Sequence, residues 1–446
     1  MNYSKLRAGI VAGAAIAVLG FGAGGRLTAQ KAAAIEGKPV QAPRFEVDPL
    51  WPKPLPNHWV LGSIGGISVD DQDHIWILQR GSRTLAENFK QLEANPPWAM
   101  CCASPPAVLE FDQEGNLLRH WGGLKDAAAG GYEWFDQEHG ITVDFKGNVW
   151  IGGGTGGDSH ILKFTKDGKF IKQFGKKDVH LVTGAAASAV GRGSAPEAGA
   201  GGGGRGRGPV RVFKANSLDM ENFGRPAKLV VDPKTNEAFV ADGYLNTRIV
   251  VMDAESGKFK RIWGAYGNKP DDSMFENAAV TGDQAATHYD PAAPPAQQFR
   301  HAVHCVMVSK DDLVYVCDRQ GDRIQVFTKE GKFLKEQWIA KETRDAGSVW
   351  DMAFSPDPAQ TYLYVGDGEN ELVHILRRDT LEELTAFGDG GRQPGQFYGV
   401  HVIATDSKGN LFTAETYEGH RVQRFIFKGI GPVTKKYQGT LWPTRR

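Results

Sequence analysis

Residues 140–151 read Gly-Ile-Thr-Val-Asp-Phe-Lys-Gly-Asn-Val-Trp-Ile. Two runs rich in β-branched and aromatic residues flank a turn that contains Asp, Gly and Asn, which is the pattern of a β-hairpin. The same unit, an apolar strand that ends in Asp or Ser, a polar turn and a second apolar strand, recurs along the chain. Its six copies are residues 66–78, 140–151, 228–242, 305–316, 351–365 and 402–413. Repetition of one short motif indicates a repeat architecture.

Two further strands follow most copies of this hairpin. Third strands begin at His160, Arg248, Arg323, Leu372 and Arg421, and fourth strands end in Trp or Phe followed by Gly at residues 121, 174, 263 and 387. Four antiparallel strands in each of six units predict an all-β fold, a six-bladed β-propeller whose first strands line the central axis. The motifs resemble NHL repeats, from about residue 59 to about residue 427.

The repeat pattern also sets the expected domain boundaries. Residues 1–30 join basic residues to an apolar, small-residue run, which is the layout of a secretory signal peptide or, alternatively, of a membrane anchor. We expect an N-terminal extension at residues 31–57, the propeller at 58–430 and a tail at 431–446. Residues 183–208, rich in Gly and Ala, are predicted to be a disordered insertion. The protein is therefore expected to be secreted or periplasmic.

The charge balance narrows the class of partner. Lys and Arg together number 52, as do Asp and Glu, so the formal net charge is zero. A neutral chain is a poor match for nucleic acid or for an anionic membrane surface. We expect a small-molecule or peptide substrate, no nucleic acid, and membrane contact only through an N-terminal anchor.

The four cysteines leave alternatives open. Cys305 and Cys317 would lie opposite each other across a hairpin centred on Asp311, where they form either a disulfide or two small buried apolar residues. Cys101 and Cys102 are adjacent in the sequence, and their pairing is not determined by it.

One position of the repeat carries unusual residues. Five positions before the closing Asp or Ser of the first strands, the six copies have Gly65, His139, Ala227, His304, Trp350 and His401. Histidine therefore alternates around the predicted ring, and alternate blades of a sixfold ring are related by about 120°. Three imidazoles converging on the axis are the ligand set of an open metal site. The alternative for each histidine is a core residue or a residue that lines the channel.

Several strings around these positions resemble peptidylglycine α-amidating lyase over essentially all the blades. They include Gln79-Arg80-Gly81, Glu138-His139-Gly140, Ala241-Asp242-Gly243-Tyr244, Val303-His304, Val400-His401 and Asp318-Arg319-Gln-Gly-Asp-Arg-Ile-Gln-Val-Phe327. The resemblance implies a zinc site, two arginines and a tyrosine that cleave a peptidyl-α-hydroxyglycine to a peptide amide and glyoxylate.

The resemblance assigns roles residue by residue. It implies that the metal ligands are His139, His304 and His401. Tyr244 would be the general base, and Arg80 and Arg319 would anchor the carboxylate and the developing charge, since the guanidinium fork matches two oxygens. Structural alternatives are a rim-packing role for Tyr244 and a surface ion pair of Arg319 with Asp318 or Asp322. Zn²⁺ is the expected cofactor, with Fe²⁺ as an alternative.

The sequence differs from the amidating lyases at two positions, so two of their features are not expected here. Similar proteins place an Asp directly after the last histidine to bind structural calcium, and this chain has Val402, so a Ca²⁺ site is doubtful. Leu245 stands where a cysteine follows the tyrosine, so the disulfide pattern does not transfer.

Two functions compete at this stage. The first is a metal-dependent carbon–nitrogen lyase, or a hydrolase that uses the same site, acting on a carbinolamide-like substrate. The alternative is a non-catalytic propeller outside the cytoplasm that binds a protein or another ligand, because the fold by itself does not favour chemistry. A lactonase-type calcium propeller fits less well, because its axis would carry Asp, Glu and Asn.

Overall fold

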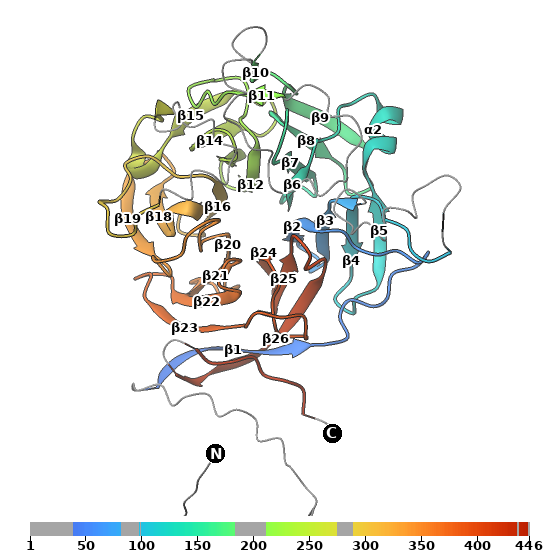
Figure 1. Cartoon of the computed structure of the whole chain (residues 1–446), viewed down its shortest axis with the longest axis vertical. Coiled ribbons are helices and arrows are strands. Elements are labelled where there is room, and N and C mark those ends of the chain that lie inside the picture. Colours follow the sequence, from blue (N-terminus) through green and yellow to red (C-terminus); the bar gives the residue numbers. More distant parts are fainter. Residues whose placement is uncertain are drawn as a thin grey trace, which may run out of the picture. The chain divides into compact units, whose positions relative to one another are not determined.

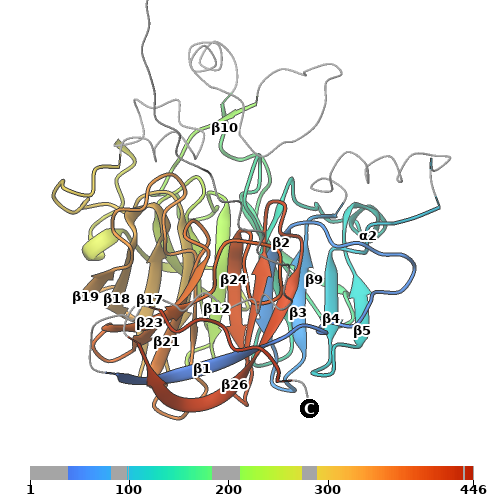
Figure 2. The ribbon, with the colours of Figure 1, turned by 60° about the horizontal axis from the view of Figure 1, so that its bottom comes forward.

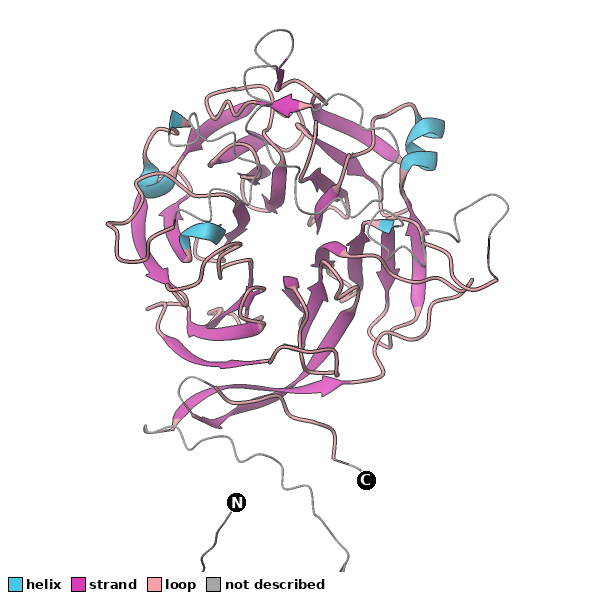
Figure 3. Ribbon diagram, viewed as in Figure 1, coloured by secondary structure: helices cyan, strands magenta, loops and turns pink. Residues whose placement is uncertain are grey.

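The computed structural model describes residues 39–81, 98, 100–182, 211–273, 289–434 and 437–444. Within these ranges, six four-stranded antiparallel sheets surround a common axis as the blades of a propeller (Figures 1 and 3). The predicted six-bladed fold is confirmed. The signal or anchor expected at residues 1–30 and the insertion expected at 183–208 lie outside the described residues.

The strands of each blade follow the chain from the axis outward. Blade one contains β2 (Ile64–Val69), β3 (Ile75–Gln79), β4 (Val108–Phe111) and β5 (Leu117–Trp121). Blade two contains β6 (Glu138–Val143), β7 (Val149–Gly153), β8 (His160–Phe164) and β9 (Phe170–Gly175). Blade three contains β12 (Pro226–Asp232), β13 (Glu237–Asp242), β14 (Arg248–Asp253) and β15 (Phe259–Trp263). Blade four contains β16 (Val303–Val308), β17 (Leu313–Asp318), β18 (Arg323–Thr328) and β19 (Phe333–Trp338).

The last two blades complete the ring. Blade five contains β20 (Asp351–Phe354), β21 (Tyr362–Asp367), β22 (Leu372–Arg377) and β23 (Glu383–Phe387). Blade six contains β24 (Val400–Thr405), β25 (Leu411–Glu415), β26 (Val422–Val433) and β1 (Val40–Asp48). The remaining elements are α2 (Leu124–Gly130), η3 (Ala265–Gly267), η5 (Arg319–Gly321) and the pair β10 (Leu181–Val182) and β11 (Val212–Phe213). Among the described helices, none is both long and apolar enough to cross a membrane.

The N-terminal strand β1 is the outermost strand of the sixth blade. The propeller therefore starts before residue 58, where the sequence predicted its first residue. Strand β1 runs antiparallel to β26 (Figure 2). Phe45 pairs with Phe427 and Asp48 pairs with Arg424. Phe45 and Val47 are buried in the core that blades five and six share. The propeller therefore begins at β1 and extends to the end of β26, because the last blade takes its outermost strand from the start of the chain.

The turns after the inner strands share the same hydrogen bonds in several blades. In blade two the Asp144 carboxylate accepts the backbone N–H groups of Lys146 and Asn148 and the indole N–H of Trp150. Asp70 binds the N–H groups of its own turn and the indole of Trp76 in the same way. One carboxylate thus fixes the turn and orients the tryptophan that packs between blades, which explains why Asp closes the inner strands.

Two buried ion pairs hold the second and third strands of a blade together. The Arg248 guanidinium lies 2.9 Å from the Asp242 carboxylate, and that of Arg323 lies 2.8 Å from Asp318. Each arginine begins a third strand and each aspartate ends a second strand. Arg323 and Asp318 belong to the string that resembles the amidating lyase, and their pairing identifies them as framework residues.

Blade five replaces this pair by a charged histidine, and this gives a pH-dependent stability. Burial opposes the charged form of His374, but hydrogen bonds to Asp367 and Glu383, at 3.0 and 2.8 Å, outweigh it and raise its pKa to about 9. A folded-state pKa above the unfolded value of about 6.5 stabilises the protein below pH ~6.5, and this contribution is lost as the pH rises through about 9. It is on the order of 3 kcal/mol at most.

Unfolding by urea checks this expectation. The free energy of unfolding of the wild type should exceed that of His374→Gln by more at about pH 6 than at about pH 9.5, where the histidine is neutral. Identical pH profiles for the two proteins would contradict the assignment of charge to His374.

The four cysteines form two disulfides. Cys305 and Cys317 are partners on the neighbouring strands β16 and β17, with Cα atoms 4.9 Å apart, so of the two alternatives the disulfide is the one found. Cys101 and Cys102 form the second bond, between adjacent residues. Disulfides are typical of proteins that fold in oxidising compartments.

Candidate metal centre

The inner strands of the propeller are interrupted by bulges where the candidate ligands stand. The pairing of β16 with β17 skips His304, and that of β24 with β25 skips His401. In blade two the pairing shifts between His139 and Ile141. A β-bulge re-aims a side chain away from the regular alternation. Here it turns one imidazole of every second blade toward the axis.

The three histidines meet as the sequence predicts. His139 Nε2 lies 3.1 Å from His401 Nε2, which lies 3.2 Å from His304 Nε2. The three rings stand nearly perpendicular to one another or steeply tilted, with centroids 4.8 to 5.0 Å apart. Each side chain is almost fully buried. The three rings therefore form one compact cluster on the axis.

The outer nitrogen of each ring fixes its protonation. His139 Nδ1 lies 2.8 Å from the Ala227 carbonyl oxygen. His401 Nδ1 lies 2.8 Å from that of Ile64, and His304 Nδ1 contacts that of Trp350. A carbonyl oxygen only accepts, so each Nδ1 carries the hydrogen and each Nε2 presents a bare lone pair to the axis. The odd blades thus orient the ligands of the even blades.

The cluster stays neutral at ordinary pH. Burial holds the pKa of all three imidazoles well below the usual 6.5, and the charge of Arg80 lowers that of His139 further. Three bare lone pairs in contact repel unless a cation lies between them. Nitrogen ligands at about 2.0–2.1 Å from a tetrahedral Zn²⁺ lie about 3.3 Å from one another, close to the separations found here. The residues present fit a divalent metal.

The Tyr244 hydroxyl lies against the open side of this cluster. Its oxygen is 2.9 Å from His139 Nε2 and 2.9 Å from His304 Nε2. It also accepts an N–H from Arg319 at 3.1 Å. Tyr244 follows directly after β13, and the loop that bears it is held by backbone hydrogen bonds to Gly224 and Arg225. The Tyr244 hydroxyl therefore lies against the histidine cluster.

Arg80 and Arg319 lie beside the cluster as buried cations. The Arg80 guanidinium donates to the Glu138 carbonyl and to the Thr416 hydroxyl, both at 3.0 Å. Gly65 allows this approach, because a Cβ there would stand 2.6 Å from the Glu138 carbonyl oxygen and 3.3 Å from Arg80 Nε. Arg319 extends over the axis toward Tyr244, away from the surface pairing with Asp318 or Asp322 that the sequence left open.

Neither of these arginines forms a direct ion pair with a carboxylate within the described residues, and this distinguishes them from the framework arginines. The exposed fractions of Arg80 and Arg319 are 8% and 6%, yet no ion pair with Asp or Glu is formed. Arg248 and Arg323, equally buried, each have an aspartate. Burying an unpaired charge is costly, so the two site arginines are poised for an anionic ligand.

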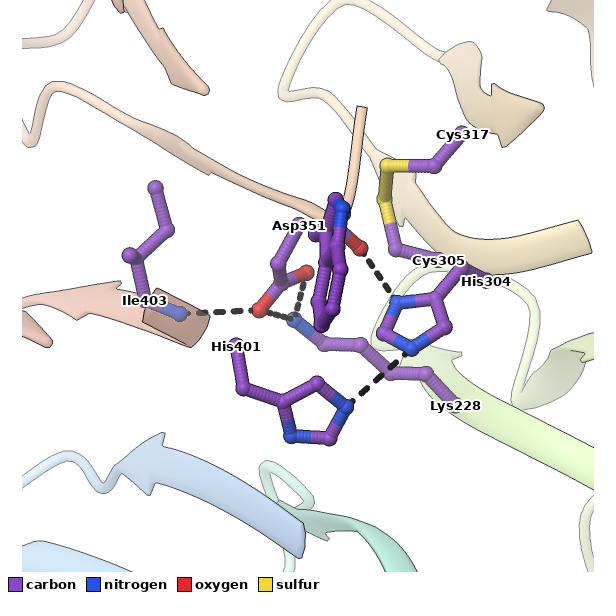
Figure 4. The surroundings of a disulfide bond; sticks show 8 residues. Lys228, His304, Cys305, Cys317, Asp351, His401 and Ile403 are labelled. Atoms are coloured by element: carbon purple, nitrogen blue, oxygen red, sulfur yellow. Dashed lines mark hydrogen bonds and ion pairs between the residues drawn. A yellow bond between two sulfur atoms is a disulfide. The ribbon is translucent and has the colours of Figure 1, made fainter. Parts of the chain in front are cut away.

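An ion pair between Lys228 and Asp351 lies near the axis, and the sequence did not predict it. The Lys228 ammonium lies 2.6 and 2.8 Å from the two Asp351 carboxylate oxygens, close to His304 and His401 (Figure 4). The same carboxylate accepts the N–H of Ile403 at 3.0 Å. Lys228 lies within the inner strand β12 and Asp351 begins the inner strand β20. In the sequence both are ordinary residues of the repeat, and only the ring geometry brings them together.

Another group with metal-binding side chains is already satisfied. Asp70, His74 and Glu110 lie together in blade one. Lys166 is 2.8 Å from Asp70, and Arg119 contacts Glu110 at 2.6 Å. Since the carboxylates are paired with these cations, the axial histidines remain the better candidate for a metal.

The chain has distant relatives among known enzymes, and no family profile matches it. It is 24% identical over 368 residues to peptidyl-glycine α-amidating monooxygenase B of Xenopus laevis, with 80% of this chain and 33% of that protein covered. It is 29% identical over 362 residues to the mouse peptidyl-glycine α-amidating monooxygenase, with 80% of this chain and 29% of that protein covered. The chain spans about a third or less of the length of these relatives.

A Drosophila relative covers more of its own length. The chain is 22% identical over 400 residues to peptidyl-α-hydroxyglycine α-amidating lyase 1, with 85% of this chain and 59% of that protein covered. Among solved structures, a streptogramin B lyase overlays with a TM-score of 0.44 at 12% identity and covers 88% of this chain. A virginiamycin B lyase of Staphylococcus aureus gives 0.42 at 13% identity over 82% of the chain. The chain is a six-bladed β-propeller distantly similar in sequence to enzymes of peptidylglycine α-amidation.

Proposed function

We propose that this protein is a metal-dependent carbon–nitrogen lyase that cleaves a carbinolamide-like substrate, an N-acylated α-hydroxy amino acid, at the axial centre. The observation that carries the proposal is one constellation: three bare Nε2 lone pairs, a tyrosine hydroxyl 2.9 Å from two of them, and two buried arginines without a carboxylate. The distant similarity to enzymes of α-amidation agrees with this chemistry.

His139, His304 and His401 would hold the metal, for which Zn²⁺ fits the nitrogen ligands, with Fe²⁺ as the alternative. When bound, the metal would supply Lewis acidity that lowers the pKa of a substrate hydroxyl. Calcium remains doubtful, since Val402 offers no side-chain oxygen and the Asp351 carboxylate is engaged by Lys228.

The protein's own side chains account for the remaining needs of the reaction. Arg80 and Arg319 would bind the substrate carboxylate, whose negative charge offsets one of the two buried positive charges. The Tyr244 oxygen would accept the proton of the α-hydroxyl. The electron pair of the broken O–H bond then forms the carbonyl of an α-keto or aldehyde acid as the C–N bond breaks. The nitrogen leaves with the electrons of the C–N bond, and the proton that Tyr244 accepted passes to it, which gives the free amide.

A direct assay tests this reaction. Purified, metal-loaded protein should convert N-benzoyl-α-hydroxyglycine to benzamide and glyoxylate in equal amounts, and removal of the metal with a chelator should lower the rate at least about a hundredfold. Benzoate in place of benzamide would instead reveal a hydrolase. No product from metal-loaded protein would reject the enzyme and leave the alternative, a propeller that binds a protein or other ligand without catalysis.

We also propose that the protein works outside the cytoplasm, secreted or periplasmic. Support comes from the two disulfides and from the signal-like or anchor-like composition of residues 1–30. A small-molecule or peptide substrate is proposed as the partner, with no nucleic acid and with membrane contact only through an N-terminal anchor.

A further inference from the structure

Trp350 occupies the axial position of blade five where the even blades have histidine. Its ring centroid lies 6.1 Å from that of His304 and 5.8 Å from that of His401. The side chain is 1% exposed. The other odd blades have small residues, Gly65 and Ala227, at this position. Among the three odd blades, only blade five therefore places a large aromatic side chain beside the histidine cluster.

The face of this indole is covered by the Arg319 guanidinium. The guanidinium carbon lies 4.9 Å from the Trp350 centroid and 5.5 Å from the Tyr244 centroid, so the cation lies against two aromatic rings. Its single side-chain hydrogen bond within the described residues goes to the Tyr244 hydroxyl, and its Nε has no partner there. Stacking on aromatic faces is thus the principal restraint on a buried cation without an anion.

Trp350 is itself held in a single orientation. Its indole N–H donates to the Gly347 carbonyl at 2.5 Å, and its own carbonyl accepts from His304. Gly368 lies against the ring, where an added Cβ would be 2.7 Å from Trp350 Cδ2. The hydrogen bond to Gly347 and the close packing of Gly368 hold the ring in place, so it offers Arg319 a rigid surface.

We propose that Trp350 is a positioning residue that holds Arg319 over the axis to receive the carboxylate of an α-hydroxy acid. This role rests on the proposed function, in which Arg319 binds the substrate carboxylate. Without the indole, the guanidinium keeps its charge but gains freedom to turn away from Tyr244. Carboxylate recognition would then weaken, whereas the metal ligands and the Trp350 carbonyl, which belongs to the backbone, would be retained.

Binding of glycolate to metal-loaded protein tests this without turnover. Titration calorimetry should show that Trp350→Leu weakens glycolate binding about tenfold and that Trp350→Phe, which keeps an aromatic face, restores most of the loss. Glycolamide, which lacks the carboxylate, should bind equally to all three proteins. Trp338→Leu is the matched control, because Trp338 has a cation, Lys341, over its ring at 5.4 Å away from the site.

A double-mutant cycle separates positioning from a merely structural role. In the Arg319→Met background, Trp350→Leu should have no further effect on glycolate, since the group it positions is gone. Equal losses in both backgrounds, or no glycolate binding by the wild type, would overturn the inference. If glycolate binds with this coupling but N-benzoyl-α-hydroxyglycine is not cleaved, the proposed lyase fails while the role of Trp350 stands.

Discussion

Replacing His139 and His304 together by alanine is expected to remove the bound metal, from near one equivalent of Zn or Fe to less than about a tenth. One imidazole cannot hold a divalent ion against exchange with water, whereas three preoriented imidazoles can. Lyase activity should fall to the level of the chelated wild type. Elemental analysis of the purified proteins gives the answer directly.

A matched control is available in the same fold. His180 is buried and its Nε2 lies 3.0 Å from the Phe223 carbonyl oxygen, but it lies off the axis. His180→Gln keeps a donor to that carbonyl and should retain the metal. Circular dichroism checks that the double variant is folded. Metal at wild-type levels in a folded double variant would place the ion elsewhere and remove the axial centre from the proposal.

The second large effect is expected for Tyr244→Phe, which should lower kcat by about 10²–10⁴-fold. The phenyl ring still fills the space beside Arg319, so the change removes one oxygen. Within the described residues, this is the only side-chain oxygen that is hydrogen-bonded to the Nε2 atoms of the cluster. Metal content should stay at the wild-type level. Steady-state kinetics with N-benzoyl-α-hydroxyglycine separate kcat from KM.

Tyr398→Phe provides the comparison for this variant. Tyr398 is 41% exposed and lies under the Arg392 guanidinium, 4.3 Å from it. Its loss of a hydroxyl should leave kcat and KM unchanged. A Tyr244→Phe enzyme with wild-type kcat would show that another group, such as water, takes the hydroxyl proton.

Local chemistry explains why so much of the fold could be predicted from the sequence. The turn carboxylate, the indole it orients and the paired strands all lie within one hairpin, as Asp144 and Trp150 show. The three histidines were found for the same reason. Each histidine occupies the same position of a short repeat. Because the blades are arranged around one axis, residues at that position point toward the same place.

The missed features depend on contacts between distant segments. β1 carries none of the repeat motif, so its place beside β26 could not be inferred from residues 40–48 alone. Lys228 and Asp351 are 123 residues apart. Trp350 was placed at the axial position of its repeat, but its contact with the Arg319 guanidinium could not be inferred from that position. Sequence reasoning finds residues that repeat, and it misses those that act through a single pairing between blades.

The pairing of β1 with β26 also has a consequence for the order of synthesis. Asp48 and Arg424, whose side chains bond, are separated by 376 residues, so blade six cannot be completed until nearly the whole chain has left the ribosome. Such a non-local closure is slow to form, because the loop entropy is lost before the contact is gained. His401 belongs to that same blade, so the third histidine of the cluster reaches the axis last. If the cluster binds a metal as proposed, a truncated or stalled chain would hold only two of its three ligands.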